Sequence, residues 1–490
     1  MKTLREYIDR LKDSGELKDV EEPIHWELEA SALTAKFNEE GREALLFQNI
    51  KKFEGISLAG GLYAGPGLLY PQKRKPWTKL ALGLEFEGEI SWEDFVINVL
   101  DLMNNPIRPM QLNTGTCKEV IRIGKDADVF GLPVPKLHQN DGGRYGSLST
   151  VIVRDPDTGQ SHWGNYRWMA VDGKNLAAHF PTGSPIADIY AKYENKDQNM
   201  PFCICIGSSP ATTFASQYQA LARVGAVDAV GMAGGLAREP LELVKAETND
   251  LLVPADDEII IEGIVPPGKR IPEGPFPNFA SYEPVTQQPV YQVKAITHRK
   301  NPIFPFSVNA ARGNDVLTLT AILHSVEITR LCRLIGVPVR WAFFPLEARM
   351  GMCVLATRVP YKGYLWQVAK YVFSWSNWFD RILFLDYDVS PEEHIQMYND
   401  MTNKASPVKG WDRSDIDAPV HRVCKYLTPE GLTSRMFINA TYDPSWPKEW
   451  HPMKTVFEEN FPQEIQERVL QKWPKLGFKQ KPLVLERPKA

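Results

Sequence analysis

The first residues of the chain predict an amphipathic helix. Thr3 and Glu6 have the spacing of a capping box, and Gly15 follows the segment as a helix stop. Between these signals, apolar residues recur at helical spacing, namely Leu4, Tyr7, Ile8 and Leu11. The next apolar run, residues 44–47, is short and continuous, and it predicts a β-strand.

The pattern changes between residues 117 and 305, where short apolar runs alternate with turn signals. Turns are indicated by DPDTG at 155–159, DGK at 172–174 and PPG at 266–268. The runs between them predict strands at residues 149–153, 166–171, 202–206, 259–264 and 291–297. This spacing of strands and turns is typical of a β-barrel or a β-sandwich.

A long helical pattern follows from about residue 315 to 335, and Gly336 and Pro338 end it. The remaining chain alternates strand-like with helical runs, such as residues 382–385 and 392–401, which indicates an α/β domain. Its last residues, 479–490, are rich in Lys and Pro and are expected to form a frayed or arm-like end.

With 490 residues, 43% of them hydrophobic, the chain is long enough for two or three domains. We expect four parts, with the long helix as a connector between domains. These parts are an N-terminal α/β region (1–115), a central β domain (116–312), a connecting helix (313–336) and a C-terminal α/β domain with its tail (337–490).

Charge and cysteine usage narrow the class of protein. The 60 acidic residues nearly balance the 56 basic ones without a Lys/Arg block, so neither a nucleic acid nor a membrane surface is expected as a partner. Six cysteines without CxxC spacing indicate reduced thiols of a cytoplasmic protein, and neither a disulfide scaffold nor a structural zinc site. No apolar run reaches the roughly 18 residues of a membrane span, and the charged start is unlike an export signal.

Several segments resemble the UbiD family of flavin-dependent reversible decarboxylases. They occur in family order from the first helix to about Thr441, nearly the whole chain. The segments are LREYIDRLKDSGEL with ALLFQNI, VFGLPVPKLHQNDGGRY, VIVRDPDTGQSHWGNYRWMAVDGKNL, ICIGSSPAT, LELVKAETNDLLVPADDEIIIEG, PEGPF and ILFLDYDVS. So many segments in one order are hard to produce by chance.

The resemblance implies a mixed α/β and β fold. A central split β-barrel of the FMN-binding type would hold prenylated FMN, between an N-terminal α/β region and a C-terminal α/β oligomerisation domain. Removing carbon dioxide from an sp2 carbon needs an electron sink that no side chain provides, and the family's modified flavin supplies it. The protein itself would hold the carboxylate, move one proton and anchor the cofactor phosphate.

By resemblance, Arg167 in GNYRWM matches the central arginine of the family, whose planar fork suits a carboxylate. Glu273 in PEGPF matches the first acid of the family's Glu-Arg-Glu or Glu-Arg-Asp network. Without these motifs, Arg167 would be interpreted as a surface residue on a strand and Glu273 as a solvated turn residue.

The family's second acid is expected five residues after the first, where this chain has Asn278. A neutral amide cannot donate a proton usefully near pH 7. We therefore expect Asn278 to orient the substrate by hydrogen bonding. The proton would come from Glu273, from a water or from the substrate.

The metal triad of the family is altered as well. Its Asn, His and Glu positions are His162, Pro185 and Ala229 in this chain. Two alternatives stay open. His162 and the neighbouring Asp228 would form a rebuilt site for Mn or Fe, or the cofactor phosphate would be held by hydrogen-bond donors or K+ without a divalent ion.

We also expect cofactor contacts around the arginine and in ICIGSSPAT, where backbone N–H groups and hydroxyls would meet a phosphate. The residues are His162, Asn165, Tyr166, Arg167, Ser208, Ser209 and Pro210. In a regular strand His162 and Arg167 would face opposite sides, so a shared site requires a bulge near Gly164. The serines have an equally simple alternative, a strand-to-helix turn with a serine N-cap.

The leading hypothesis is a reversible decarboxylase or carboxylase of an aromatic or α,β-unsaturated acid. Its partners would be the substrate, carbon dioxide, a flavin prenyltransferase that supplies the cofactor, further copies of the chain in a dimer or hexamer, and other carboxylase subunits. A second hypothesis is a non-catalytic UbiD-like subunit of a larger carboxylase, because an acid and the metal triad are missing. A third, a flavin reductase, lacks a nicotinamide-binding signal.

Overall fold

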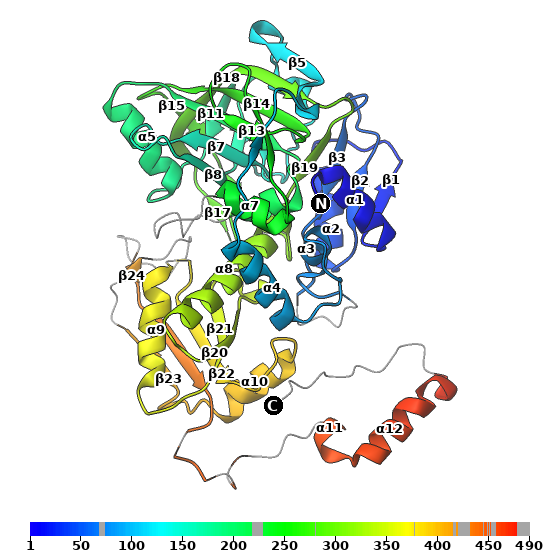
Figure 1. The fold of residues 1–490 in the computed structure, drawn as a ribbon, viewed down its shortest axis with the longest axis vertical. Coiled ribbons are helices and arrows are strands. Elements are labelled where there is room, and N and C mark those ends of the chain that lie inside the picture. Colours follow the sequence, from blue (N-terminus) through cyan, green and yellow to red (C-terminus); the bar gives the residue numbers. More distant parts are fainter. Residues whose placement is uncertain are drawn as a thin grey trace.

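The computed structural model describes residues 1–67, 74–217, 229–279, 281–376, 378–414, 418–419, 432–443, 445–447, 449, 451 and 457–477. Figure 1 shows the N-terminal region and a central β domain together at one end of the molecule. The helix α8 (Asp315–Leu334) leads from them into the C-terminal domain, and α11 (Phe457–Asn460) and α12 (Gln463–Lys472) extend away from it. No helix among these residues is long and apolar enough to cross a membrane.

The N-terminal region has the predicted helix and strand. The hydroxyl of Thr3 accepts a hydrogen bond from the backbone N–H of Glu6 at 3.1 Å and caps α1 (Leu4–Asp13). The predicted apolar positions of α1 are all buried: Leu4, Tyr7, Ile8 and Leu11. A sheet of β1 (Leu17–Val20), β2 (Ala44–Phe47), β3 (Ser57–Gly60) and β19 (Ile303–Phe306) joins this region to the end of the central domain. α2 (Glu29–Glu39) and α3 (Thr78–Gly83) complete it.

The central domain is built on a ten-stranded sheet that curls into a half-barrel. The order is β6 (Arg144–Gly146), β9 (Trp168–Ala170), β10 (Asn175–Ala178), β18 (Thr286–His298), β14 (Ile259–Val265), β11 (Met200–Ile206), β7 (Thr150–Arg154) and β8 (Ser161–Asn165), with β5 (Val120–Ile123) and β15 (Arg270–Glu273) also paired to β18. Its interior is a hydrophobic cluster that includes Tyr145, Trp168, Phe202 and Tyr291. α5 (Pro185–Asn195), α6 (Pro210–Ala215) and α7 (Ala229–Ala237) lie between its strands in sequence.

Four of the five predicted strands of this domain are present with ends shifted by a few residues. The fifth, residues 166–171, is wrong in its first part. β8 ends at Asn165 and β9 begins at Trp168, and the two strands pair with different neighbours, β7 and β10. The chain therefore leaves the strand at Tyr166 and Arg167.

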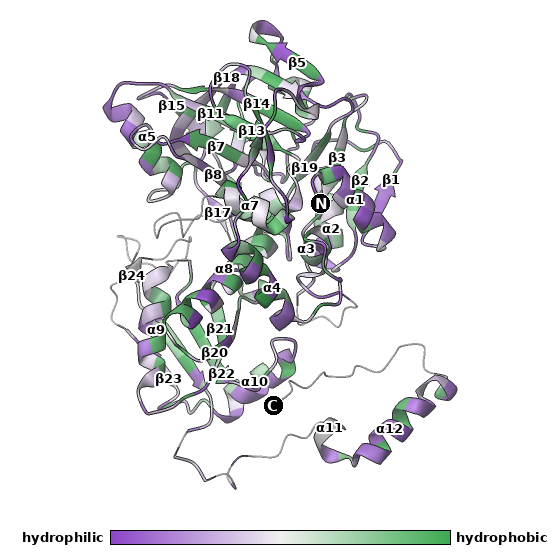
Figure 2. Ribbon diagram, viewed as in Figure 1, coloured by the Kyte–Doolittle hydropathy of each residue, from purple (hydrophilic) through white to green (hydrophobic). Residues whose placement is uncertain are grey.

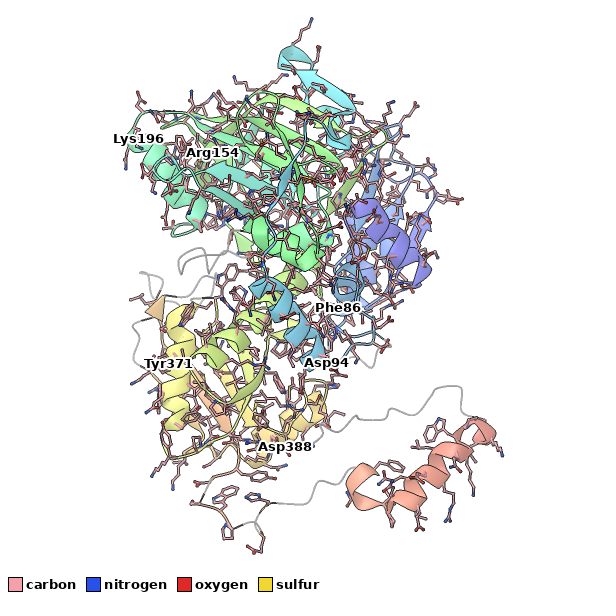
Figure 3. The ribbon with its side chains drawn as sticks, viewed as in Figure 1. Phe86, Asp94, Arg154, Lys196, Tyr371 and Asp388 are labelled. Atoms are coloured by element: carbon pink, nitrogen blue, oxygen red, sulfur yellow. The ribbon has the colours of Figure 1, made fainter. Side chains whose placement is uncertain are left out.

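The C-terminal domain is an α/β unit, as its sequence pattern indicates. Its sheet has the order β20 (Val339–Phe343), β21 (Met352–Thr357), β22 (Arg381–Asp386), β26 (Met436–Ala440) and β23 (Trp411–Arg413), and its helices are α9 (Tyr364–Trp375) and α10 (His394–Asn403). Figure 2 shows hydrophobic residues concentrated in β20 to β22, whereas α12 is largely polar. α4 (Trp92–Asn104), marked by Asp94 in Figure 3, packs against α8. The predicted tail, 479–490, lies outside the described residues.

Candidate active site

Arg167 lies in the break between β8 and β9, and its side chain is only 9% exposed. Its Nε and Nη2 donate to the two carboxylate oxygens of Glu273 at 3.0 Å each. Its Nη1 forms an ion pair with Oε2 of Glu283 at 2.7 Å. One guanidinium is thus held between two carboxylates. The ring of Phe276 lies 4.8 Å from it.

Glu273 is the last residue of β15, which pairs with β18 opposite Thr286. The turn after it is held by close backbone packing, because the N–H of Gly142 donates to the carbonyl of Pro275 at 2.9 Å. A Cβ on Gly142 would lie 2.0 Å from the carbonyl oxygen of Gly274, so this position requires glycine. The segment NDGGRY and the turn PEGPF therefore fit against each other.

The carboxylate of Glu273 is completely buried and has three polar neighbours. Besides Arg167, the hydroxyl of Tyr145 donates to its Oε1 at 3.1 Å, and Nδ1 of His179 lies 3.5 Å from its Oε2. Burial alone would raise the pKa of Glu273, but His179 and the charge of Arg167 outweigh it and lower the pKa to about 2. Glu273 is an anion at neutral pH.

Glu283 is the last residue of β17 (Tyr282–Glu283), which pairs with β16 (Phe276–Pro277) in a short hairpin. Its side chain is 18% exposed, more than that of Glu273. Burial opposes ionisation, but the charge of Arg167 outweighs it, so the pKa of Glu283 is lowered. Burial and the charge of Arg167 also lower the pKa of His179, which leaves its imidazole neutral at pH 7.

Asn278 does not contact Arg167. Its Nδ2 donates to Oε1 of Glu283 at 2.8 Å, and its Oδ1 accepts from the backbone N–H of Phe279 at 2.9 Å. The second carboxylate beside Arg167 is Glu283, which the sequence reasoning overlooked. A signal existed, because Glu283 is the next acidic residue after Glu273. His179 and Tyr145 were overlooked as well.

His162 lies on β8, five residues before the arginine, and β8 pairs with β7 in regular register, so no bulge occurs at Gly164. The expected bulge is wrong, since the chain changes direction after Asn165 instead. Nε2 of His162 lies 2.9 Å from the hydroxyl of Tyr166. A Cβ on Gly164 would lie 2.4 Å from the ring of Tyr166 and 2.9 Å from Nε2 of His162, so glycine permits this contact. Burial lowers the pKa of His162 to about 4.

The three positions of the family's metal triad lie on β8, α5 and α7, and both helices contact β8. Pro185 is the first residue of α5 and Ala229 the first of α7. Asp228 lies outside the described residues. Among the residues that are described, no three His, Cys, Asp or Glu side chains gather as metal ligands would.

The segment at Ser208 forms the strand-to-helix turn that was one of its two interpretations. The hydroxyl of Ser208 donates to the buried carboxyl of Asp257 at 2.7 Å. The hydroxyl of Ser209 accepts from the backbone N–H of Thr212 at 3.3 Å, and Pro210 is the first residue of α6. Both serine side chains therefore have partners within the protein.

A pocket opens beside this turn. It is lined by hydroxyl and apolar groups from the N-terminal region, β7, β11 and α6, among them Tyr63, Ser149, Thr150, Cys205, Ser208 and Thr213. Thr150 pairs with Asn165, two residues before the arginine. The backbone N–H of Asn165 donates to the carbonyl of Ser216, and the buried Nε2 of the adjacent Gln217 has no partner among the described residues.

Three consecutive parts of the chain match the domains of one protein family. Residues 8–95, 108–312 and 317–440 match, in this order, the N-terminal, Rift-related and C-terminal domains of 3-octaprenyl-4-hydroxybenzoate carboxy-lyase. The chain is 27% identical to pyrrole-2-carboxylic acid decarboxylase of Pseudomonas aeruginosa, covering 97% of this chain and 98% of that protein. It is 30% identical to ferulic acid decarboxylase 1 of Saccharomyces cerevisiae over 73% of this chain and 72% of that protein.

Solved structures show the same fold. The UbiD-class enzyme HmfF from Pelotomaculum thermopropionicum, in complex with FMN, matches with a TM-score of 0.81 and 24% identity over 95% of this chain and 99% of that chain. An evolved dimeric form of HmfF in complex with prFMN matches with a TM-score of 0.78 and 23% identity over 95% and 100% of the two chains. The expected fold class is confirmed.

Proposed function

Because this chain belongs to the UbiD family of carboxy-lyases through its N-terminal, central and C-terminal domains, we propose that it reversibly decarboxylates an aromatic or α,β-unsaturated acid with prenylated FMN. The observation that supports this most is the Glu273–Arg167–Glu283 network, buried at the end of the half-barrel strands. The acids in the names of the two relatives carry their carboxyl on an sp2 carbon, and we expect the same of this substrate.

The residues near Arg167 fit a flavin cofactor. The buried amide of Gln217 lacks an acceptor among the described residues, which is costly unless a ligand supplies one. Asn165, Tyr166 and His162 lie on the same segment. When bound, the prenylated flavin supplies the electron sink for the carbon that loses carbon dioxide.

Arg167 binds the substrate carboxylate in this proposal. Among the described residues, the contacts of the free site join one cation, Arg167, with two anions, Glu273 and Glu283, which gives one net negative charge while His179 is neutral. A carboxylate substrate adds a second negative charge beside the same arginine. Like charges raise the pKa of a carboxyl group, so substrate binding favours uptake of one proton.

Glu283 takes up that proton more readily than Glu273. Glu273 has a bidentate contact with Arg167 plus Tyr145 and His179, whereas Glu283 has one contact with Arg167 and one with Asn278. Protonation of Glu283 also releases Nη1 of Arg167 for the substrate carboxylate. We therefore assign Glu283 the role of general acid, and of general base in the reverse direction.

The experiment uses protein produced together with a flavin prenyltransferase. Pyrrole-2-carboxylate, ferulate and benzoate are offered to it, and carbon dioxide release and deuterium incorporation at the vacated carbon are measured. We expect turnover of at least one acid, slowed roughly 10²- to 10⁴-fold by Glu283→Gln and only weakened by the neighbouring Asn278→Ala. Full cofactor loading without turnover or exchange on any acid would refute the proposal and favour the non-catalytic subunit.

We further expect the enzyme to act in the cytoplasm as a homo-oligomer. The described cysteines are buried and unpaired, which suits a reducing compartment. A flavin prenyltransferase is the expected supplier of the cofactor. Glu283 provides a second carboxylate beside Arg167, which supports the catalytic hypothesis over the non-catalytic subunit.

A further inference from the structure

The hairpin that carries Glu283 is too short to hold its own position. β16 and β17 share two residue pairs, Phe276 with Glu283 and Pro277 with Tyr282. An isolated two-stranded hairpin is marginally stable even when it is longer. The 2.7 Å contact between Glu283 and Arg167 must therefore depend on what the rest of the protein does to this hairpin.

The base of the hairpin is held by the central domain. The hydroxyl of Tyr282 donates to Oδ1 of Asp141 at 3.3 Å. The ring of Phe276 packs against the ring of Tyr145 with centroids 4.2 Å apart. These contacts fix the strands where they leave the domain, but they leave the tip at Asn278 and Phe279 to other partners.

The tip is held by the C-terminal domain. Nη1 of Arg349 donates to the carbonyl oxygen of Phe279 at 3.1 Å. The ring of Phe279 packs edge-on against Trp378 at 5.5 Å, and Trp378 packs in turn against His324 of α8 at 5.4 Å. Phe279 and Trp378 both pack against the hydrophobic core of the C-terminal domain. Figure 1 shows β17 at the edge of the central domain that faces α8.

Asn278 connects this docked tip to the acid. Its Oδ1 accepts from the backbone N–H of Phe279 at 2.9 Å, and its Nδ2 donates to Oε1 of Glu283 at 2.8 Å. A continuous set of contacts therefore runs from Arg349 and Trp378 through Phe279 and Asn278 to Glu283. Each contact is direct, and the backbone bond from Asn278 to Ser281 at 3.0 Å closes the tip.

The turn that presents Arg349 is itself strained. Arg349 and the following Met350 have φ angles of 46° and 66°, in the left-handed region that residues with a side chain seldom adopt. Such a conformation is unfavourable for residues with a side chain, so tertiary contacts must hold it. The bond to Phe279 is one such contact.

We propose that Phe279, Arg349 and Trp378 form a docking latch by which the C-terminal domain positions Glu283 against Arg167. The latch rests on the proposed function, because it acts through the proton that Glu283 carries. With the tip docked, Asn278 holds Glu283 within contact of Arg167. With the latch broken, the hairpin keeps only its base contacts and Glu283 loses the fixed geometry that proton transfer requires.

The test compares Arg349→Ala and Trp378→Leu with the matched control Arg340→Ala. Arg340 is also an arginine of the C-terminal domain that contacts another part of the chain, since its Nε donates to Glu93 of α4 at 2.9 Å and its Nη1 to the carbonyl of Tyr387 at 3.1 Å. It does not touch the hairpin. Holoenzyme is used throughout, and kcat, KM and backbone hydrogen–deuterium exchange of residues 276–283 are measured.

We expect both latch variants to lower kcat roughly 10- to 100-fold, the scale for misplacing a reacting group, with a much smaller change in KM. Exchange in residues 276–283 should rise in the latch variants and stay unchanged in Arg340→Ala. Adding Arg349→Ala to Glu283→Gln should change the residual rate by less than about twofold, because both act through one group.

Equal effects of Arg349→Ala and Arg340→Ala on kcat and on hydrogen–deuterium exchange, with Glu283→Gln strongly slowed, would overturn the latch alone. No turnover or exchange by the loaded wild-type holoenzyme would overturn the proposed function. Full activity of Glu283→Gln would overturn the role of Glu283 as the acid, and the latch with it as a catalytic device. Additive losses in the double variant would show that Arg349 acts on something other than Glu283.

Discussion

Replacing each carboxylate beside Arg167 in turn should separate catalysis from stability. In Glu283→Gln, Arg167 loses one ion pair at 2.7 Å but keeps its two hydrogen bonds to Glu273. The free energy of unfolding should therefore decrease by only about 1–2 kcal/mol. The proton can no longer be held at this position. General acid–base catalysis is typically worth 10²- to 10⁴-fold, or about 3–5 kcal/mol of barrier, and kcat should drop by that amount.

Glu273→Gln should behave differently. Glu273 is completely buried, and its replacement removes the charge that faces both Arg167 and His179. Breaking a buried ion pair on one side costs about 3–5 kcal/mol of folding stability, so this variant should be destabilised as well as inactive. Urea unfolding measures the stability of each variant, and deuterium incorporation followed by NMR measures the proton transfer.

We predict a folded, cofactor-loaded Glu283→Gln protein with strongly slowed deuterium exchange. Asn278→Ala serves as the control, because it removes a partner of Glu283 but not the carboxylate, and it should retain part of the activity. Exchange at the wild-type rate in Glu283→Gln would refute the assignment of the acid. A Glu283→Gln protein that unfolds as easily as Glu273→Gln would instead refute the expected difference in stability between the two contacts.

Three further changes test other parts of the site. Arg167→Lys keeps the charge but loses the fork between the carboxylates, and kcat/KM should fall by an amount equivalent to roughly 2–4 kcal/mol in a steady-state assay. The pKa of Glu273 is lowered from 4.5 to about 2, so its ionised form contributes about 3 kcal/mol of folding stability above pH 4.5. This stability is lost as the pH falls toward 2. In acid unfolding, the stability of Glu273→Gln should therefore lack this pH-dependent loss. Gly164→Ala places a Cβ 2.4 Å from the ring of Tyr166 and should weaken flavin retention in absorbance spectra, whereas Gly131→Ala, with its nearest neighbour at 3.5 Å, should not.

Local patterns in the sequence were sufficient for much of the fold. The first helix was predicted because its cap at Thr3 and its apolar face lie within a few consecutive residues. The strand runs of the central domain and the helix α8 were predicted for the same reason, since hydrophobic periodicity is a local property. The sequence did not predict the break at Tyr166 and Arg167, because the apolar pattern runs on from β8 to β9. Only the pairing of the two strands with different neighbours reveals the break.

Local sequence patterns did not identify all residues of the candidate active site. Resemblance to a family motif led to Arg167 and Glu273, which the structure joins by two hydrogen bonds. The spacing of the family motif predicted the second acid at position 278, which is Asn278. The hairpin instead pairs Phe276 with Glu283, and the carboxylate of Glu283 lies beside Arg167. His179 and Tyr145 come from segments that are distant in sequence and carry no motif of their own. The sequence by itself predicted most of the elements, and its resemblance to a family pointed to Arg167. Only the tertiary structure decided which acids surround that arginine, because ion pairing depends on distance in space and a hairpin changes that distance without changing the spacing in the chain.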